Sequence, residues 1–68
     1  MTNETADADA ELRTLVHALR TPLTIVDGFA DALVARGDEM SPEDRTEYIE
    51  QIRDAAREMR DLLDGVRR

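Results

Sequence analysis

The chain of 68 residues contains no cysteine and only one histidine. Without cysteine there are no disulfide bonds and no thiolate metal sites, and a single histidine excludes a histidine-rich metal cluster. Aromatic residues are also scarce, with one phenylalanine, one tyrosine and no tryptophan. A core built from so short a chain is marginal by itself. Since neither disulfides nor a metal can stabilise it, we expect a second chain to complete the core.

Long apolar runs are missing as well. None is long enough to span a bilayer, and the acidic N-terminus does not resemble a signal peptide. With 16 acidic and 9 basic residues, the chain has a net charge of −7. Such a charge disfavours nucleic acids and anionic lipid surfaces as partners. The composition therefore predicts a cytoplasmic domain that binds neither nucleic acid nor a membrane.

The sequence does contain apolar residues at helical spacing, and no stretch alternates with the period of a strand. Residues 1–7 are polar and expected to be flexible. A first helix is predicted over about 8–36, capped by Asp7 or Asp9 and ended by Gly37. Its apolar residues follow one another at alternating steps of four and three, as in a heptad repeat. They are Leu12, Val16, Leu19, Leu23, Val26, Ala30 and Leu33.

A second helix is predicted over about 42–67, after a turn at 37–41. Ser41 is expected to cap this helix, and Pro42 occupies its first position. Its apolar residues again recur at steps of four and three: Tyr48, Ile52, Ala55, Met59, Leu62 and Val66. Two helices joined by a short turn form an antiparallel hairpin, which cannot cover both of its apolar stripes. We therefore predict an all-α fold in which two hairpins form a homodimeric four-helix bundle.

The first helix includes a residue that helices avoid. Pro22 lacks the N–H that would bind the carbonyl of Ala18, and its ring crowds that carbonyl at a cost of about 3 kcal/mol, so a kink is expected. His17 precedes it beside the apolar stripe, on the side expected to face solvent, with Arg20 and Thr21 one turn ahead. An exposed imidazole is a nucleophile near neutral pH. Taken singly, these residues also fit a surface histidine, an accidental kink and a threonine bonded to the backbone.

Together, however, they resemble a known motif. His17–Leu23, with the sequence HALRTPL, resembles the phosphoacceptor motif His-Glu-Leu-Arg-Thr-Pro-Leu of sensor histidine kinases. Thr24–Phe29 resembles the Ser/Thr-Ile-x-Gly pattern that follows this motif in the family. The likeness extends over roughly 12–68, and we assign 8–68 to one domain. It implies a dimerisation and histidine-phosphotransfer domain that forms a homodimeric four-helix bundle, with His17 phosphorylated on Nε2.

The resemblance also implies roles for the neighbours of this histidine. Thr21 stands where the family positions water to dephosphorylate a partner's aspartyl phosphate, and Arg20 matches a basic residue near the phosphorylated site. Pro22 matches the kink that loosens the helix for signalling motions, and Gly28 matches the family glycine. The implied partners are a response-regulator receiver and a kinase ATP-binding domain acting in trans. No cofactor or metal is expected in this chain, because ATP would be bound by a separate domain and magnesium would come with the kinase or the receiver.

Ala18 departs from the family, which has an acidic residue after the histidine. That carboxylate orients the imidazole or accepts its proton, so its loss is expected to slow autophosphorylation by about 10²–10⁴. The chain also contains no glycine-rich loop or nucleotide-binding box. Membership of the protein-histidine kinase class is therefore implied by the resemblance, but we do not expect this chain to be a complete kinase alone.

Three functions stay open. We prefer a phosphotransfer module of a two-component system, in which His17 carries a phosphoryl group between a kinase ATP-binding domain and a receiver aspartate. The second is a receiver-binding phosphatase or sequestering module, in which Thr21 acts and His17 is never modified; Ala18 favours this function. The third is a dimerising interaction module without phosphotransfer, in which the histidine is inert.

Overall fold

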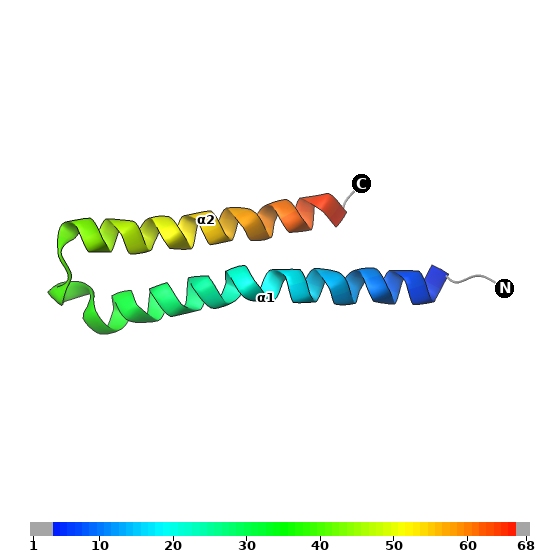
Figure 1. Ribbon diagram of the computed structural model, residues 1–68, viewed down its shortest axis with the longest axis horizontal. Helices are drawn as coiled ribbons and strands as arrows, with labels where there is room; N and C mark the ends of the chain where they lie inside the picture. The colour runs from blue at the N-terminus through cyan, green and yellow to red at the C-terminus, as the bar shows by residue number, and fades with distance from the viewer. Residues whose placement is uncertain (1–3, 67–68) are drawn as a thin grey trace.

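The computed structural model describes residues 4–66 and consists of two long helices joined by a short turn. Helix α1 spans Glu4–Arg36, a 3₁₀ turn η1 spans Gly37–Glu39, and helix α2 spans Pro42–Val66. The two helices lie side by side and antiparallel, and the start of α1 projects beyond the end of α2 (Figure 1). The helical hairpin predicted from the sequence is confirmed.

The start of α1 differs from the prediction. The helix already includes residues 4–7, which were expected to be flexible, and it does not begin at about residue 8. Asp7 and Asp9 lie within the helix, so the capping role predicted for one of them is wrong. The segment ETADADAE explains the earlier start, because alanine favours helix and acidic side chains interact well with the positive end of the helix dipole. Residues 1–3, also predicted to be flexible, lie outside the described part, as does residue 67 at the predicted end of the second helix.

The connection between the helices follows its local sequence. Helix α1 ends at Arg36, directly before Gly37, as expected. The Oγ atom of Ser41 accepts a hydrogen bond of 3.1 Å from the backbone N–H of Asp44, so this serine caps α2 as predicted. Arg45 reaches back from the first turn of α2 and donates a hydrogen bond of 2.9 Å to the carbonyl of Gly37. These contacts tie the start of α2 to the end of α1.

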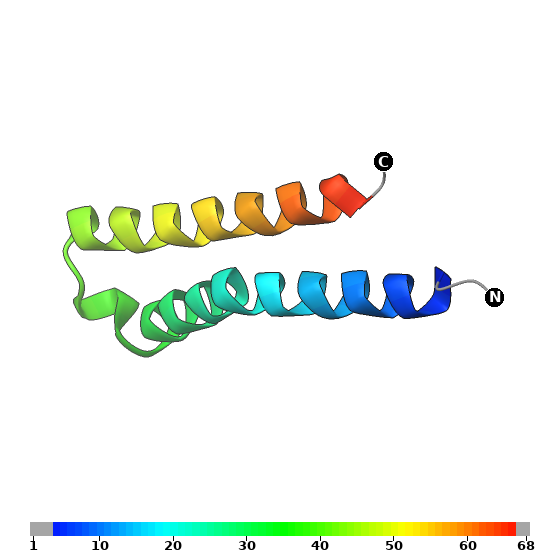
Figure 2. The same ribbon diagram turned by 45° about the vertical axis from the view of Figure 1, so that its right-hand side comes forward.

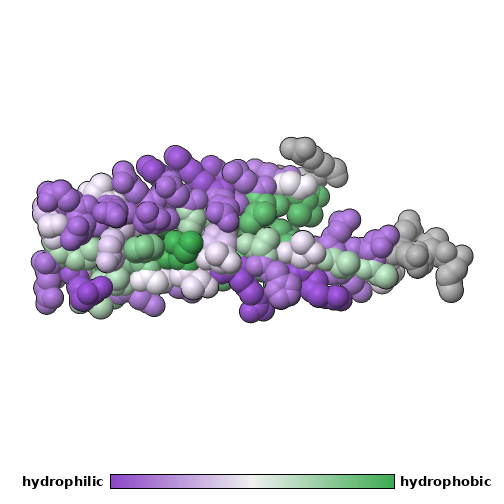
Figure 3. Space-filling model, in the orientation of Figure 1, coloured by the Kyte–Doolittle hydropathy of each residue, from purple (hydrophilic) through white to green (hydrophobic). Residues whose placement is uncertain are grey.

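Side chains at the boundary between the helices recur every seven residues. On α1 they are Phe29, Pro22 and Leu15, and on α2 they are Tyr48, Ala55 and Leu62. The rings of Phe29 and Tyr48 meet edge to face with their centroids 4.8 Å apart. Pro22, less than 2% exposed, and Ala55, 5% exposed, are the most buried side chains of the described residues. On the face shown in Figure 3, apolar side chains follow the line between the helices and hydrophilic ones cover the outer edges.

A second set of apolar side chains has no partner within the hairpin. On α1, Leu12, Val16 and Leu23 are 60%, 41% and 47% exposed, and they lie about 80–120° around the helix from Pro22. On α2, the exposed residues Ile49 and Leu63 lie about 120° and about 80° from Ala55 in the same rotational sense. Because the helices are antiparallel, both sets face the same side of the hairpin; we call this surface the apolar face.

The hairpin is one layer thick. Its extents are 61 × 20 × 11 Å, and the shortest of these equals the diameter of a single helix. Over residues 4–66, neither helix has an apolar stretch of the length that a bilayer crossing requires. The fold therefore presents two long, accessible surfaces, of which one is apolar and the other includes the groove between the helices.

Candidate functional site

His17 lies on the outer edge of α1, near the middle of the hairpin. Its side chain is exposed, and it lies about 140° around the helix from Pro22, which packs against α2. His17 is rotated from Pro22 in the opposite sense to the residues of the apolar face. The imidazole therefore projects away from both α2 and the apolar face, which is the position expected from the sequence.

Charged and hydroxyl side chains surround this imidazole. Arg13 lies one turn before His17, and Arg20 and Thr21 lie one turn after it, all with exposed side chains. A threonine does bond to the helix backbone here, but it is Thr24, whose Oγ1 donates a hydrogen bond of 2.9 Å to the carbonyl of Arg20. Within residues 4–66, the hydroxyl of Thr21 makes no side-chain hydrogen bond, so it is available to a ligand or a water molecule.

Pro22 bends α1 without ending it. The helix continues through the proline to Arg36, and Figure 2 shows that its axis changes direction in the cyan part, which includes this residue. Since proline has no N–H, the carbonyl of Ala18 lacks its usual helical donor. The backbone directly after His17 is therefore held less firmly than the rest of α1.

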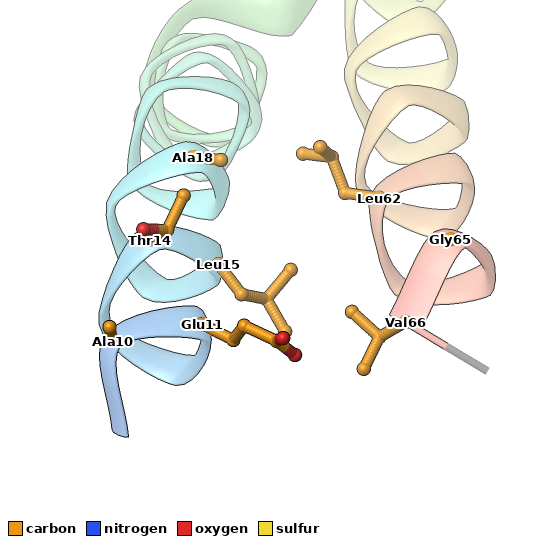
Figure 4. Close-up of a pocket in the computed structure, with 8 residues that line it drawn as sticks. All are labelled: Ala10, Glu11, Thr14, Leu15, Ala18, Leu62, Gly65 and Val66. Carbon is orange, nitrogen blue, oxygen red and sulfur yellow. The ribbon is translucent and has the colours of Figure 1, made fainter. Parts of the chain in front are cut away.

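Ala18 faces a different way from His17. It is half-buried and lines a groove of about 510 Å³ between the first half of α1 and the last turns of α2. Leu15 and Leu62 point into this groove, and the carboxylate of Glu11 is directed toward α2 (Figure 4). On α1, Glu11 is the acidic residue nearest in sequence to His17, but it lies about 9 Å away along the axis. No carboxylate of α1 is thus placed to act on the imidazole in place of the missing family acid.

The chemistry of this surface is that of an anion site next to a nucleophile. Within residues 4–66, no group of three His, Asp or Glu side chains is arranged to hold a metal ion. The groups near the imidazole are guanidinium and hydroxyl donors, which bind phosphate-like oxygens. An exposed ring nitrogen can form a bond to phosphorus, and the neighbouring donors can stabilise the negative charge of the phosphoryl group.

Sequence reasoning missed one cluster on α2. Arg53, Arg57 and Arg60 follow one another at steps of four and three, so they share a face of the helix. No role was predicted for them from the sequence. Their spacing, in a chain rich in acidic residues, is the signal that could have found them.

The family comparison identifies the chemistry. Residues 8–68 match the His Kinase A (phospho-acceptor) domain, HisKA. The chain belongs to the HisKA family. This match covers all of the hairpin except the first residues of α1, and it makes the chain a phosphoacceptor module of the two-component histidine kinase class. Comparison with curated proteins and with solved structures found no match.

Proposed function

We propose that this HisKA domain carries a phosphoryl group on His17. It receives the group from the ATP-binding domain of a histidine kinase acting in trans and passes it to the aspartate of a response-regulator receiver. The observation that supports this most strongly is that the chain has one histidine and that its side chain is exposed. A phosphoacceptor domain with a single histidine has only one imidazole that can accept the phosphoryl group.

The proposed reaction has two steps, and both take place at residues on the outer edge of α1. Nε2 of His17 attacks the γ-phosphorus of ATP, the bond from this phosphorus to the bridging oxygen breaks, and ADP leaves with the electron pair. The ring then loses the proton on Nδ1. In the second step, a carboxylate oxygen of the receiver attacks the same phosphorus and the P–N bond breaks. Arg20, one turn from the imidazole, pairs with the phosphoryl oxygens in both steps.

We infer that the domain works as a homodimer. The apolar face is long, it has no partner within the hairpin, and the hairpin is only one layer thick. Two copies related by a twofold axis along the bundle bury these faces against each other. In that arrangement, the outer edge of α1 with its histidine stays accessible to kinase and receiver.

A second candidate is dephosphorylation of a bound receiver. Thr21 supports it, because its hydroxyl is exposed and makes no side-chain hydrogen bond within the described residues. Ala18 supports it as well, since the missing acid weakens phosphorylation more than it weakens receiver binding.

The test uses a small phosphodonor, so that neither partner needs to be known. When the domain reacts with phosphoramidate, Nε2 of His17 bonds to phosphorus, the P–N bond of the donor breaks, and ammonia leaves. We expect an acid-labile, base-stable phosphate on the wild-type domain and none on His17→Gln. An unlabelled wild-type domain that is folded and dimeric would contradict the proposal.

The second function is measured with phosphorylated receivers. If His17→Gln still accelerates loss of receiver phosphate and Thr21→Ala does not, the domain is a phosphatase module. If the domain binds receivers but catalyses neither reaction, it is an interaction module, and both catalytic functions are wrong.

A further inference from the structure

Three arginines form a cationic hollow on α2. Arg53, Arg57 and Arg60 surround Ala56, whose small side chain leaves a space of about 450 Å³ between them. Three of the nine basic residues of a chain with net charge −7 are thus gathered on two turns. Arg53 pairs with Asp54 at 3.1 Å, but their side chains are 50% and 61% exposed, so the pair is weak. Within residues 4–66, Arg57 and Arg60 have no acidic partner, which leaves two guanidiniums for an outside anion.

The packing register places this hollow at the height of the phosphoacceptor. The rings of Phe29 and Tyr48 are in contact, so these two residues lie at the same height in the antiparallel hairpin. His17 is twelve residues before Phe29 on α1, and Arg60 is twelve residues after Tyr48 on α2. Both residues are therefore displaced by the same distance from the turn, and His17 is level with Arg60. Arg57 lies about 4.5 Å nearer the turn.

Within one hairpin, however, the histidine and the arginines cannot meet. His17 is on the outer edge of α1. The three arginines lie about 140–160° around α2 from Ala55, which faces α1, so they occupy the outer edge of α2. Both helices stand between the imidazole and the hollow of the same chain.

A twofold dimer removes this separation. When two apolar faces pack together, α1 of one protomer lies next to α2 of the other, with about 8–10 Å between the axes. Because the twofold axis follows the bundle, heights are the same in both protomers. Arg57 and Arg60 of the partner subunit then lie on the same outer flank as His17, one helix away and at its level.

We propose that Arg57 and Arg60 of the partner subunit bind the phosphoryl group on His17, so that each phosphoacceptor site is built from two chains. This rests on the proposed function and on the homodimer. A phosphoryl group brings negative charge to a chain that is already strongly acidic, and guanidiniums from the partner offset that charge. Together with Arg20 of the same chain, they surround the phosphoryl oxygens from two sides.

The test uses mixed dimers of two differently tagged chains, isolated by tandem purification and labelled with phosphoramidate. One chain keeps His17, and the other has His17→Gln, so only one site can react. The pair of changes Arg57→Gln and Arg60→Gln is placed either on the His17→Gln chain or on the chain that keeps the histidine.

Placed on the His17→Gln chain, the two changes remove the arginines that face the reactive site. We expect the rate of labelling to fall about tenfold, or about threefold for each guanidinium, as for exposed ion pairs. Placed on the chain that keeps the histidine, they affect only the site that cannot react, and the rate should stay the same. Arg36→Gln on either chain removes one positive charge near the turn, far from the imidazole, and serves as the matched control.

Equal rates in the two arrangements, or a larger loss when the changes are on the chain with the histidine, would overturn the inference. These outcomes are distinct from failure of the proposed function. If the proposed function is wrong, the wild-type dimer will not be labelled at all; if the homodimer is wrong, sedimentation will show no dimer. Circular dichroism of each mixed dimer establishes that the helices are intact.

Discussion

At the scale of single residues, we expect the side chain at position 18 to decide how well the imidazole reacts with ATP. An acid at this position can take the proton that the ring loses, and alanine cannot. The position borders an open groove, so a longer side chain fits without disturbing the contact between the helices. We therefore expect Ala18 to limit the rate of phosphorylation by the kinase without affecting the fold.

Replacing Ala18 by glutamate tests this limit. With ATP and an isolated kinase ATP-binding domain, we expect Ala18→Glu to raise the rate of His17 phosphorylation by about 10²–10⁴, the usual worth of a general base. Ala18→Gln, which has the same shape but no basic oxygen, should react at the wild-type rate. The rate is measured from the acid-labile phosphate formed with time. Equal rates for the two variants would show that the missing acid is not what limits the reaction.

The residues of the site differ in how far the sequence revealed them. His17 could be found because it is the only histidine and stands in a motif of known chemistry. The three arginines of the cationic hollow could have been found from their spacing, but their relation to His17 could not, because it depends on the register of the hairpin. Only the distance from Phe29 to Tyr48 and the burial of Pro22 and Ala55 fix that register.

At the scale of the helices, boundaries with a local chemical signal were predicted and the others were not. Ser41 and Gly37 act within one turn of their own position, so the end of α1 and the start of α2 follow from the sequence. No comparable signal marks a boundary near residue 8, and α1 already includes Glu4. Likewise, only part of the wide apolar stripe of α1 packs against α2, and the rest is exposed. Helical periodicity alone does not say which half of the stripe packs against α2.

Pro22 and Ala55, the two buried side chains of the described residues, lie where the helices pack near the bend. Because position 55 is already buried, a larger side chain there is expected to push α2 away from α1. We expect Ala55→Leu to lower the free energy of unfolding by about 1–3 kcal/mol. Ala35→Leu, at an exposed position of α1, should change it little. Thermal unfolding at one protein concentration compares the variants, and equal stability would show that the two helices are not in tight contact here.

At the scale of the whole molecule, we expect folding and association to be one process. Within residues 4–66, the one-layer hairpin fully buries only Ala55 and Pro22. Most of its apolar stabilisation is therefore expected to come from a second copy. The net charge of −7 on each chain opposes that association. Salt screens the repulsion, and the dimer is therefore expected to be more stable at higher ionic strength.

A charge placed on the apolar face should separate the protomers. Leu23→Glu puts a carboxylate where the second hairpin packs, and burying it without a partner is costly. We expect sedimentation to show a monomer and circular dichroism to show reduced helicity. The unfolding temperature should lose the concentration dependence that we expect for a dimeric wild type. Ile25→Glu changes an apolar residue, 36% exposed, on the other side of α1, and this variant should stay dimeric. Because the two substitutions are chemically the same and only two residues apart, a dimer in both would mean that the protomers associate through some other surface.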